Sequence, residues 1–351
     1  MITVISPGRV QFDGSLTESE VAAIAVDRTV KCLQTSNPVS VETAQHLEGL
    51  FAQRPDVTFR LYGYGVRHDL SILKCLPSIE RLSVDGRTRV QHSDCLALLP
   101  HLKRLTFDER DERDFGFLDN LPSELFSLSL SATTGRDVDL GHLTRYQHLR
   151  GLSIDGCKRH IGSLEELREL ESLILRGVTP GDLGFVKPLK NLQMLYIDGG
   201  ALRDFSALEG NTSVRNFTLG RVTGLDDLSF VGRMPGLEWF FAYWMRNVKS
   251  LPDFSGSPRL ETLVFETMNG LVDFAGLSTA PVLRVFLDIA APTGLDVAAT
   301  MASVLAVPTL ETCLIGFGSK KKNAMAQAAV EAQGLKWEYV APTLRAGDWF
   351  A

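Results

Sequence analysis

The chain has 351 residues, of which 44% are hydrophobic and 22% charged, and its formal net charge is -6. This charge balance lacks the basic excess that nucleic acids and anionic membranes attract, so we expect neither as a partner. No stretch approaches the roughly 18 uninterrupted apolar residues of a membrane helix, and residues 1–14 show no secretory-signal pattern, which together predict a cytoplasmic protein.

The first 54 residues contain no regular repeat and are predicted to form an N-terminal cap. Thr17 and Glu20 have the spacing of a capping box that opens a short helix, and residues 29–33 are a candidate first strand. Ser40 precedes a longer amphipathic helix. Its predicted apolar face consists of Val41, Ala44, Leu47, Leu50 and Phe51. A repeat array needs such a cap because its terminal coil otherwise leaves the core face uncovered.

A pattern of the form L-x-x-L-x-L then recurs along most of the chain. In residues 164–197 each apolar residue of the first copy has a counterpart 22 positions later. The first apolar residues of the successive units are Val57, Ile79, Leu102, Leu125, Leu149, Leu170, Leu192, Val214, Leu237, Leu260, Leu283 and Leu310. The first unit is weak because Arg60 stands where a leucine is expected, and an insertion at 296–305 lengthens the last interval. A period of this size is the signature of a leucine-rich repeat, in which each coil supplies one strand and one return segment.

Short segments with an aspartate followed by an apolar and a small residue recur between the predicted strands. They contain Asp69, Asp114, Asp182, Asp204, Asp227, Asp253 and Asp273. A carboxylate at such a position accepts hydrogen bonds from the free N–H groups of a short helical turn. We therefore interpret these aspartates as structural caps on the convex side and not as catalytic residues.

The end of the repeat region resembles a second cap. Residues 324–332 have the composition of a helix, Gly334 is expected to stop it, and residues 335–340 are a candidate last strand. The basic run at 320–322 immediately precedes this helix. We interpret the run as a solvated helix start, in preference to a phosphate-binding patch.

The repeats and their L-x-D-[FL]-[SA] return segments resemble leucine-rich repeat proteins, most closely the roughly 22-residue class of internalins and protein-phosphatase-1 regulators. The resemblance covers residues 57–317, although the family's asparagine ladder is absent. It implies an α/β solenoid, a horseshoe with a parallel β-sheet on the concave face and short helical turns or loops on the convex face. We expect one continuous domain with an N-terminal cap at 1–54, about 12 repeats at 55–318, and a C-terminal cap and tail at 319–351.

The variable positions of the pattern are predicted to line the concave face, because alternate residues of a strand point to opposite sides. Small polar and charged residues occupy these positions in the early repeats, and aromatic residues gather in the later ones. Aromatic side chains are favoured anchors at protein interfaces. The candidate partner-binding residues are Met194, Tyr196, Asp198, Trp239, Phe241, Tyr243, Trp244, Val264 and Glu266. In the alternative interpretation, these side chains pack on one another or beneath an irregular loop.

Acidic residues end several of the predicted strands. Asp85, Asp155 and Asp198 are each followed by glycine, which is typical of a turn. The alternative is a negative strip that helps to select a basic partner. The mixed run at 108–114 is expected to form a solvated loop.

Motifs for catalysis are absent from the sequence. There is no phosphate-binding, zinc-binding or nucleophile motif, the seven histidines lack the usual i, i+4 ligand pair, and the five cysteines contain no C-x-x-C pair. We therefore expect no catalytic residue, metal, cofactor or small-molecule substrate. The favoured function is a scaffold that binds a protein partner on its concave face, as a bacterial intracellular inhibitor or immunity protein; the alternative is an enzyme with a site at residues 292–340.

Overall fold

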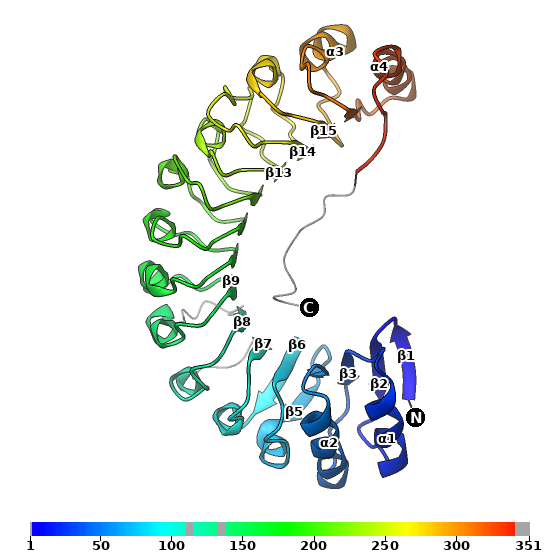
Figure 1. The fold of residues 1–351 in the computed structure, drawn as a ribbon, viewed down its shortest axis with the longest axis vertical. Helices are drawn as coiled ribbons and strands as arrows, with labels where there is room; N and C mark the ends of the chain where they lie inside the picture. The colour runs from blue at the N-terminus through cyan, green and yellow to red at the C-terminus, as the bar shows by residue number, and fades with distance from the viewer. Residues whose placement is uncertain (1, 110–114, 132–137, 341–351) are drawn as a thin grey trace. The chain divides into compact units, whose positions relative to one another are not determined.

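The computed structural model describes residues 2–109, 115–131 and 138–340. The chain divides into two compact units, with the boundary between Leu170 and Glu171. Within each unit the strands lie along one side, and the helices and short helical turns lie along the other (Figure 1). This is the arrangement that a repeat of one strand and one return segment requires. The predicted boundaries of the caps at residues 54 and 318 stay a prediction.

The first unit holds the N-terminal cap and the early repeats. Its strands are β1 (Ile2–Ser6), β2 (Arg9–Phe12), β3 (Cys32–Thr35), β4 (Thr58–Tyr62), β5 (Arg67–Asp69), β6 (Arg81–Gln91), β7 (Arg104–Glu109), β8 (Ser127–Ser131) and β9 (Gly151–Asp155). Its helices and 3-10 turns are α1 (Glu18–Val26), α2 (Val41–Gln53), η1 (Leu70–Cys75), η2 (Ser93–Leu98), η3 (Gly116–Asp119), η4 (Leu140–Arg145) and η5 (Ile161–Glu166). The strands follow the order β1-β2-β3-β4-β6-β7-β8-β9, with β5 paired to β6. Only the β1–β2 pair among these described strands is antiparallel.

The second unit holds the later repeats and the C-terminal cap. Its strands are β10 (Ser172–Arg176), β11 (Met194–Asp198), β12 (Asn216–Gly220), β13 (Trp239–Tyr243), β14 (Thr262–Glu266), β15 (Val285–Asp288) and β16 (Thr312–Ile315). Its helices and turns are η6 (Gly184–Val186), η7 (Ser206–Leu208), η8 (Val231–Arg233), η9 (Ala275–Thr279), α3 (Val297–Leu305) and α4 (Lys320–Ala332). The strands pair in parallel and in sequence order.

The repeat pattern predicted the strands of both units correctly. Each strand from β6 to β16 begins two residues after the first apolar residue of its unit. The apolar residues of the pattern are buried, as Leu192, Leu195 and Ile197 illustrate for β11, and equivalent positions pair across neighbouring strands, as Leu195 does with Phe217. Burial of one such side chain stabilises the fold by about 1.5 to 3 kcal/mol. The predicted leucine-rich repeat fold is therefore confirmed.

The prediction for the first repeat was wrong by one residue. In β4, Phe59 pairs with Leu82 and Leu61 pairs with Val84, and all four side chains are buried. Arg60 therefore points to the other face of the sheet, which we call the open face because it lies away from the core. The core pattern of this unit is kept, and the arginine does not interrupt it.

Arg60 is used on the open face to bind a neighbouring strand. Its guanidinium donates to both carboxylate oxygens of Asp85, at 2.7 and 2.5 Å. Gly86, the next residue, has a φ of +77°. The predicted strand-ending turn at Asp85 is nevertheless wrong, because β6 continues to Gln91 and the pairing with β7 only shifts its register between Val84 and Thr88.

The N-terminal cap begins with a hairpin that was not predicted, formed by β1 and β2. The predicted capping box is present, because Thr17 accepts from the N–H of Glu20 while Glu20 accepts from the N–H of Thr17. Ser40 caps α2 as predicted. Four of the five predicted apolar residues of α2 are buried, but Val41 is exposed because it lies in the first turn, before the helix meets the sheet. The predicted strand at 29–33 begins three residues later, at Cys32.

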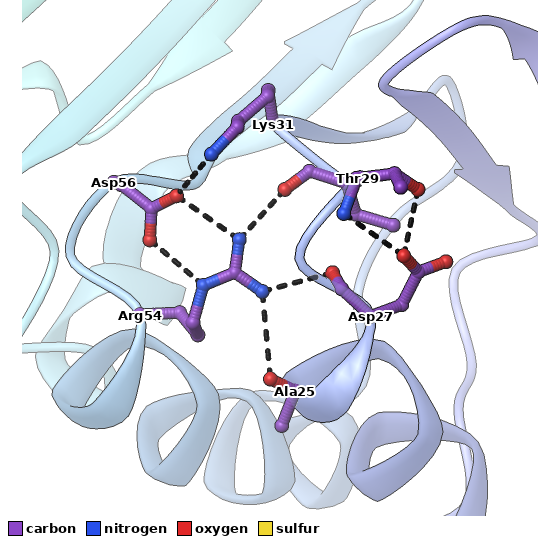
Figure 2. A network of polar contacts seen from close by, with 7 residues as sticks. Ala25, Asp27, Thr29, Lys31, Arg54 and Asp56 are labelled. Atoms are coloured by element: carbon purple, nitrogen blue, oxygen red, sulfur yellow. Dashed lines mark hydrogen bonds and ion pairs between the residues drawn. The ribbon is translucent and has the colours of Figure 1, made fainter.

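A buried arginine joins the two helices of this cap (Figure 2). The Arg54 side chain is 1% exposed and follows the last residue of α2. Its Nη1 donates to the carbonyl oxygens of Ala25 and Asp27 at 3.4 and 3.0 Å, and its Nη2 donates to that of Val30 at 2.8 Å. The first of these carbonyls lies in the last turn of α1, where the peptide groups have no helical partner.

The charge of Arg54 is balanced by Asp56, which accepts from Nε at 2.8 Å and from Nη2 at 3.0 Å (Figure 2). This hydrogen-bonded pair raises the pKa of Arg54 and lowers the pKa of Asp56. A buried cation is stable only when it is paired and hydrogen-bonded in this way.

The C-terminal cap agrees with the sequence in its helix and differs in its strand. The basic run begins α4, and Lys322 donates to the carbonyl oxygens of Thr293 and Leu295 at 2.7 and 3.0 Å. The insertion forms α3, whose first turn is capped by Asp296. The predicted strand at 335–340 is wrong, because Lys336 makes only an isolated bridge with Thr312. Most of the residues after it are exposed, so little buried surface holds them against the sheet.

The predicted capping aspartates are confirmed wherever the structure describes them. Each accepts a hydrogen bond of 2.6 to 2.9 Å from the N–H two residues later: Asp69, Asp182, Asp204, Asp227, Asp253 and Asp273. Asp139 does the same, although it was not predicted. Asp114 and most of the predicted loop at 108–114 lie outside the described residues.

One aspartate occupies a core position of the repeat. Asp288 stands where the last leucine of its unit is expected, between the buried Phe265 and Ile315 of the adjacent strands. Its carboxylate oxygens are buried, and neither has a hydrogen-bond partner in the described part of the chain. Burial raises the pKa of Asp288 to about 7.

Replacing Arg54 by alanine should destabilise the cap, because three carbonyl groups lose their donor and Asp56 loses its buried partner. We expect a loss of about 2 to 4 kcal/mol in the free energy of unfolding measured by urea denaturation. Lys31→Ala is the matched control, since Lys31 is exposed and binds the same Asp56; a surface ion pair contributes at most about 1 kcal/mol. Equal losses in the two variants would contradict this role of Arg54.

Replacing Asp288 by asparagine should remove a pH-dependent weakness of the second unit. The pKa of about 7 in the folded state exceeds the ordinary value of 3.8. The folded protein therefore retains a proton that the unfolded chain releases, and stability falls as the pH rises from about 4 to about 7. At pH 8 Asp288→Asn should be more stable than the parent by up to roughly 4 kcal/mol, with a much smaller gap at pH 5. Urea denaturation at both pH values tests this, with the exposed Asp226→Asn as control; a gap independent of pH would refute it.

Candidate functional site

The open face of the second unit carries a group of aromatic side chains. The strand register places Tyr196 of β11 in the same row as Phe241 of β13, and Trp239 and Tyr243 lie on either side of Phe241 along β13. We call Tyr196, Trp239, Phe241 and Tyr243 the aromatic cluster. Each of these side chains is partly exposed. The alternation of the repeat therefore predicted correctly that they share one face of the sheet.

The rings of the aromatic cluster also pack on one another. The centroids of Trp239 and Phe241 are 6.0 Å apart with an interplanar angle of 61°, and those of Phe241 and Tyr243 are 5.2 Å apart at 32°. Edge-to-face and tilted pairs of this kind are favourable contacts. The packing of these side chains on one another, which was the alternative interpretation, is therefore present, and the rings still retain accessible surface. Partner binding at these residues stays a prediction.

Hydrogen bonds fix the two tyrosines of the cluster. The hydroxyl groups of Tyr196 and Tyr243 are 2.8 Å apart, and the guanidinium of Arg176 lies 5.3 Å from the centroid of the Tyr196 ring. Burial, together with hydrogen bonds to Tyr196 and Asp198, raises the pKa of Tyr243. Tyr243 therefore stays a neutral hydroxyl over the physiological pH range.

Gly220 provides the space in which the Tyr243 ring lies. The two residues pair across β12 and β13, and a Cβ atom on Gly220 would come within 2.1 Å of Cζ of Tyr243. Any other residue at position 220 would thus displace this ring. The glycine was visible in the sequence, but its role depends on the residue that faces it on the next strand.

The predicted contact residue Asp198 is used inside the protein. Its side chain is nearly buried and accepts two hydrogen bonds from Arg221, one of them 2.6 Å from Nε. The pair raises the pKa of Arg221. The prediction that Asp198 is a contact residue is therefore corrected, because its carboxylate is already occupied. Gly199 has a φ of +76°, which agrees with the alternative prediction of a strand-ending turn.

Two further predicted contact residues lie below the surface. Met194 is 4% exposed and Val264 is 1% exposed. Both stand at variable positions of the repeat. Val264 is smaller than the ring of Phe241 beside it in the register, and Met194 lies between Ser172 and Asn216. They support the aromatic cluster and do not offer a contact surface. Trp244, by contrast, is 56% exposed, and Glu266 is partly exposed.

Pairs of histidine and aspartate connect successive coils of the first unit, and sequence reasoning missed them. The Nδ1 atoms of the histidines lie 2.6 to 2.7 Å from carboxylate oxygens in the pairs His92–Asp69, His142–Asp119 and His160–Asp139. The partners are 21 or 23 residues apart, which is the repeat period. That spacing is the signal that would have revealed them. Over the ranges that the structure covers, no group of three or more His, Cys, Asp or Glu residues is arranged to hold a metal ion.

The segment proposed for an alternative enzyme site forms α3, α4 and their connections. Its most distinctive polar group, Lys322, binds two backbone carbonyl oxygens. This contact joins the insertion to the terminal helix and gives the lysine a structural role. The enzyme alternative for this segment stays a prediction.

Comparisons with known proteins agree with the repeat architecture. A leucine-rich repeat protein of Leptospira interrogans has a TM-score of 0.50 and 12% identity, over 93% of this chain and 93% of that one. The internalin InlF of Listeria monocytogenes gives 0.47 and 16%, over 86% and 81%. The Drosophila Toll–Spatzle complex gives 0.49 and 12%, over 90% of this chain and 50% of the matched chain. No protein-family model and no curated protein matches the sequence. At these identities the likeness shows the fold alone, and by its fold the chain is a leucine-rich repeat protein.

None of the helices in the described ranges has the length and hydropathy that crossing a bilayer requires. The expected cytoplasmic location stays a prediction.

Replacing Gly220 by alanine should displace Tyr243 from the aromatic cluster while leaving the buried leucines in place. The Tyr243 hydroxyl would then lose its bond to Tyr196, and its pKa should fall towards the ordinary value of 10.0. Spectrophotometric titration should show one fewer late-ionising tyrosine than in the parent, where burial also raises the pKa of Tyr146 to about 12. Gly181→Ala, at an open position with no neighbour within 4 Å, is the control. An unchanged titration in Gly220→Ala would contradict the packing described for Tyr243.

Proposed function

We propose that the chain is a binding scaffold that holds a protein partner on the open face of the second unit. The observation that carries this proposal is the aromatic cluster, with four partly exposed rings on β11 and β13, followed in the chain by the exposed Trp244. Exposed apolar groups of this kind are uncommon on a free surface and are favoured at interfaces.

The geometry of the cluster suits a protein surface better than a small ligand. Three of its rings follow one another along β13, and Tyr196 lies two strands away, in β11. Neighbouring strands are about 4.8 Å apart, so the cluster covers roughly 10 Å across the sheet. A partner's side chains can pack against rings spread in this way and be surrounded by polar contacts at the rim.

The rings are held in place before any partner arrives. The Tyr196–Tyr243 hydrogen bond and the Asp198–Arg221 pair fix side chains that would otherwise rotate freely. Ordering one such side chain on binding costs about 0.5 to 1.5 kcal/mol. A preformed cluster therefore retains more of its contact energy as affinity.

A finer form of the proposal is that the partner is an enzyme or toxin and that the chain acts as its bacterial inhibitor or immunity protein. Support for it comes from the sequence, which contains an interaction fold and no recognised catalytic motif. The identity of a captured partner, followed by an assay of its activity with and without the chain, decides between inhibition and simple scaffolding.

The proposal is tested by replacing Trp239 and Phe241 together with serine. Affinity purification from the source cells, quantified by mass spectrometry, should recover a partner with the parent protein and lose it with this variant. An affinity at least about 30-fold weaker is expected for the loss of a central aromatic anchor.

The matched control is Tyr64→Ser, which removes a highly exposed aromatic residue from the first unit. Circular dichroism and thermal unfolding should show that both variants fold. If the double variant retains the partner at parental affinity, the open face of the second unit is not the binding surface.

A further inference from the structure

The residue that follows each strand from β10 to β14 adopts a left-handed backbone conformation. The φ values are +61°, +76°, +52°, +55° and +56° for Gly177, Gly199, Arg221, Trp244 and Thr267. This conformation lets the backbone N–H reach the neighbouring strand, as in the 2.8 Å bond from Gly177 to Asp198 and the 3.0 Å bond from Trp244 to Glu266. Glycine adopts it without strain, and residues with a side chain do not. Trp244 is therefore an unusual occupant of a position that favours glycine.

Most other residues with this strain have a local contact that compensates for it. Five non-glycine residues with positive φ occur among the described residues. Three of them bind a carboxylate of the preceding coil through their side chains, in the pairs His92–Asp69, His160–Asp139 and Arg221–Asp198. Trp244 has no side-chain hydrogen bond or ring contact in the part of the chain that the structure describes, and 56% of it is exposed. Among the described residues, no polar or ring contact of its side chain therefore offsets the strained backbone.

A strained residue whose side chain has no such contact within the fold is a candidate for a role in binding another molecule. Trp244 directly follows Tyr243, the last residue of β13, so its backbone lies next to the aromatic cluster. Glu266 lies on the next strand, pairs with Tyr243 in the register and accepts the backbone N–H of Trp244. The Glu266 side chain is partly exposed and has no hydrogen bond or ion pair with any described residue. An indole face and an unpaired carboxylate together favour a cation.

Three other charged residues of this surface are already engaged. Asp198 and Arg221 bind each other, and Arg176 lies over the Tyr196 ring. Arg246 follows the buried Met245 and lies in the turn that leaves the strand. The carboxylate of Glu266 is thus a negative charge that a basic side chain of a partner can still complement.

We propose that Trp244 and Glu266 form a subsite for a lysine or arginine side chain of the partner protein, whose neighbouring apolar residues contact the aromatic cluster. This inference rests on the proposed function and assigns the chemistry of the partner segment. The cation would stack on the indole of Trp244 and pair with Glu266, while an apolar neighbour covers the rings of Phe241 and Tyr243.

The test uses a random peptide library displayed on phage, selected on the full-length parent protein. Enriched peptides should combine a basic residue with an adjacent apolar one. Synthetic copies should bind Trp244→Gly at least tenfold more weakly than the parent and Glu266→Gln several-fold more weakly. Thr267→Gly is the matched control, because it relieves the same backbone strain one coil later and should leave the affinity unchanged.

Thermal unfolding supplies a second readout, which a merely structural tryptophan would move in the opposite direction. Glycine relieves the left-handed strain, so Trp244→Gly and Thr267→Gly should each raise the melting temperature by about 1 to 3 °C. A gain in stability combined with a loss of binding supports the subsite. A clear loss of stability in Trp244→Gly would show that the indole packs against the protein, and would overturn the proposal.

The remaining outcomes separate this inference from the proposed function. Peptides that lose binding to the Trp239→Ser, Phe241→Ser variant but keep parental affinity for Trp244→Gly would overturn the subsite and leave the proposed function standing. A library that yields no peptide preferring the parent over that double variant would contradict both. A parent dimer that Trp244→Gly converts to a monomer in size-exclusion chromatography would show that a second copy occupies the surface, and would also overturn the proposal.

Discussion

Burial of the apolar positions of the repeat is the constraint on which the other features of the structure depend. A strand has a side-chain period of two, so a shift of one residue would exchange its core and open faces. Burial of each leucine stabilises the correct register by about 1.5 to 3 kcal/mol. In β11 to β13 this locks Leu195, Phe217 and Phe240 into one row below the sheet. The aromatic cluster exists as a surface because the residues between these core positions have no other side on which to lie.

The same constraint explains why the fold could be predicted from the sequence. The core positions repeat with a spacing that does not depend on what any single repeat carries elsewhere, and the capping aspartates depend only on their own backbone two residues later. Arg60 shows where prediction of core positions from the repeat spacing fails. Counting three residues from Val57 places Arg60 in the core. The pairing of Phe59 with Leu82 shows instead that the core residue is Phe59, one position earlier. A weak first repeat contains too few apolar residues to fix its own register.

The candidate site could be predicted only in part, because exposure depends on pairs of residues from different strands. The alternation placed Met194, Val264 and Asp198 on the open face, but neighbouring side chains bury all three. Gly220 has no evident role in the sequence, because only the structure shows that the Tyr243 ring occupies the space above it. The histidine–aspartate pairs and Asp288 would have appeared in an alignment of the repeats with one another, since the pairs recur at the repeat spacing and Asp288 occupies a leucine column. These features become visible only when equivalent positions of different repeats are compared, and a pattern counted within a single repeat does not include them.

Two kinds of side chain meet on the open face of the second unit, and their energetics differ. Tyr196, Tyr243, Asp198 and Arg221 are bound to one another, so their order is a property of the folded chain and is retained when the surface is free. Trp244 is exposed on a backbone conformation that disfavours a residue with a side chain, and no hydrogen bond or ring contact within the described residues orders its indole. A rigid cluster reduces the entropy that binding costs, whereas a strained anchor adds contact surface at the expense of stability. That combination is expected where a surface is shaped by an interaction with another molecule and not by the packing of its own core.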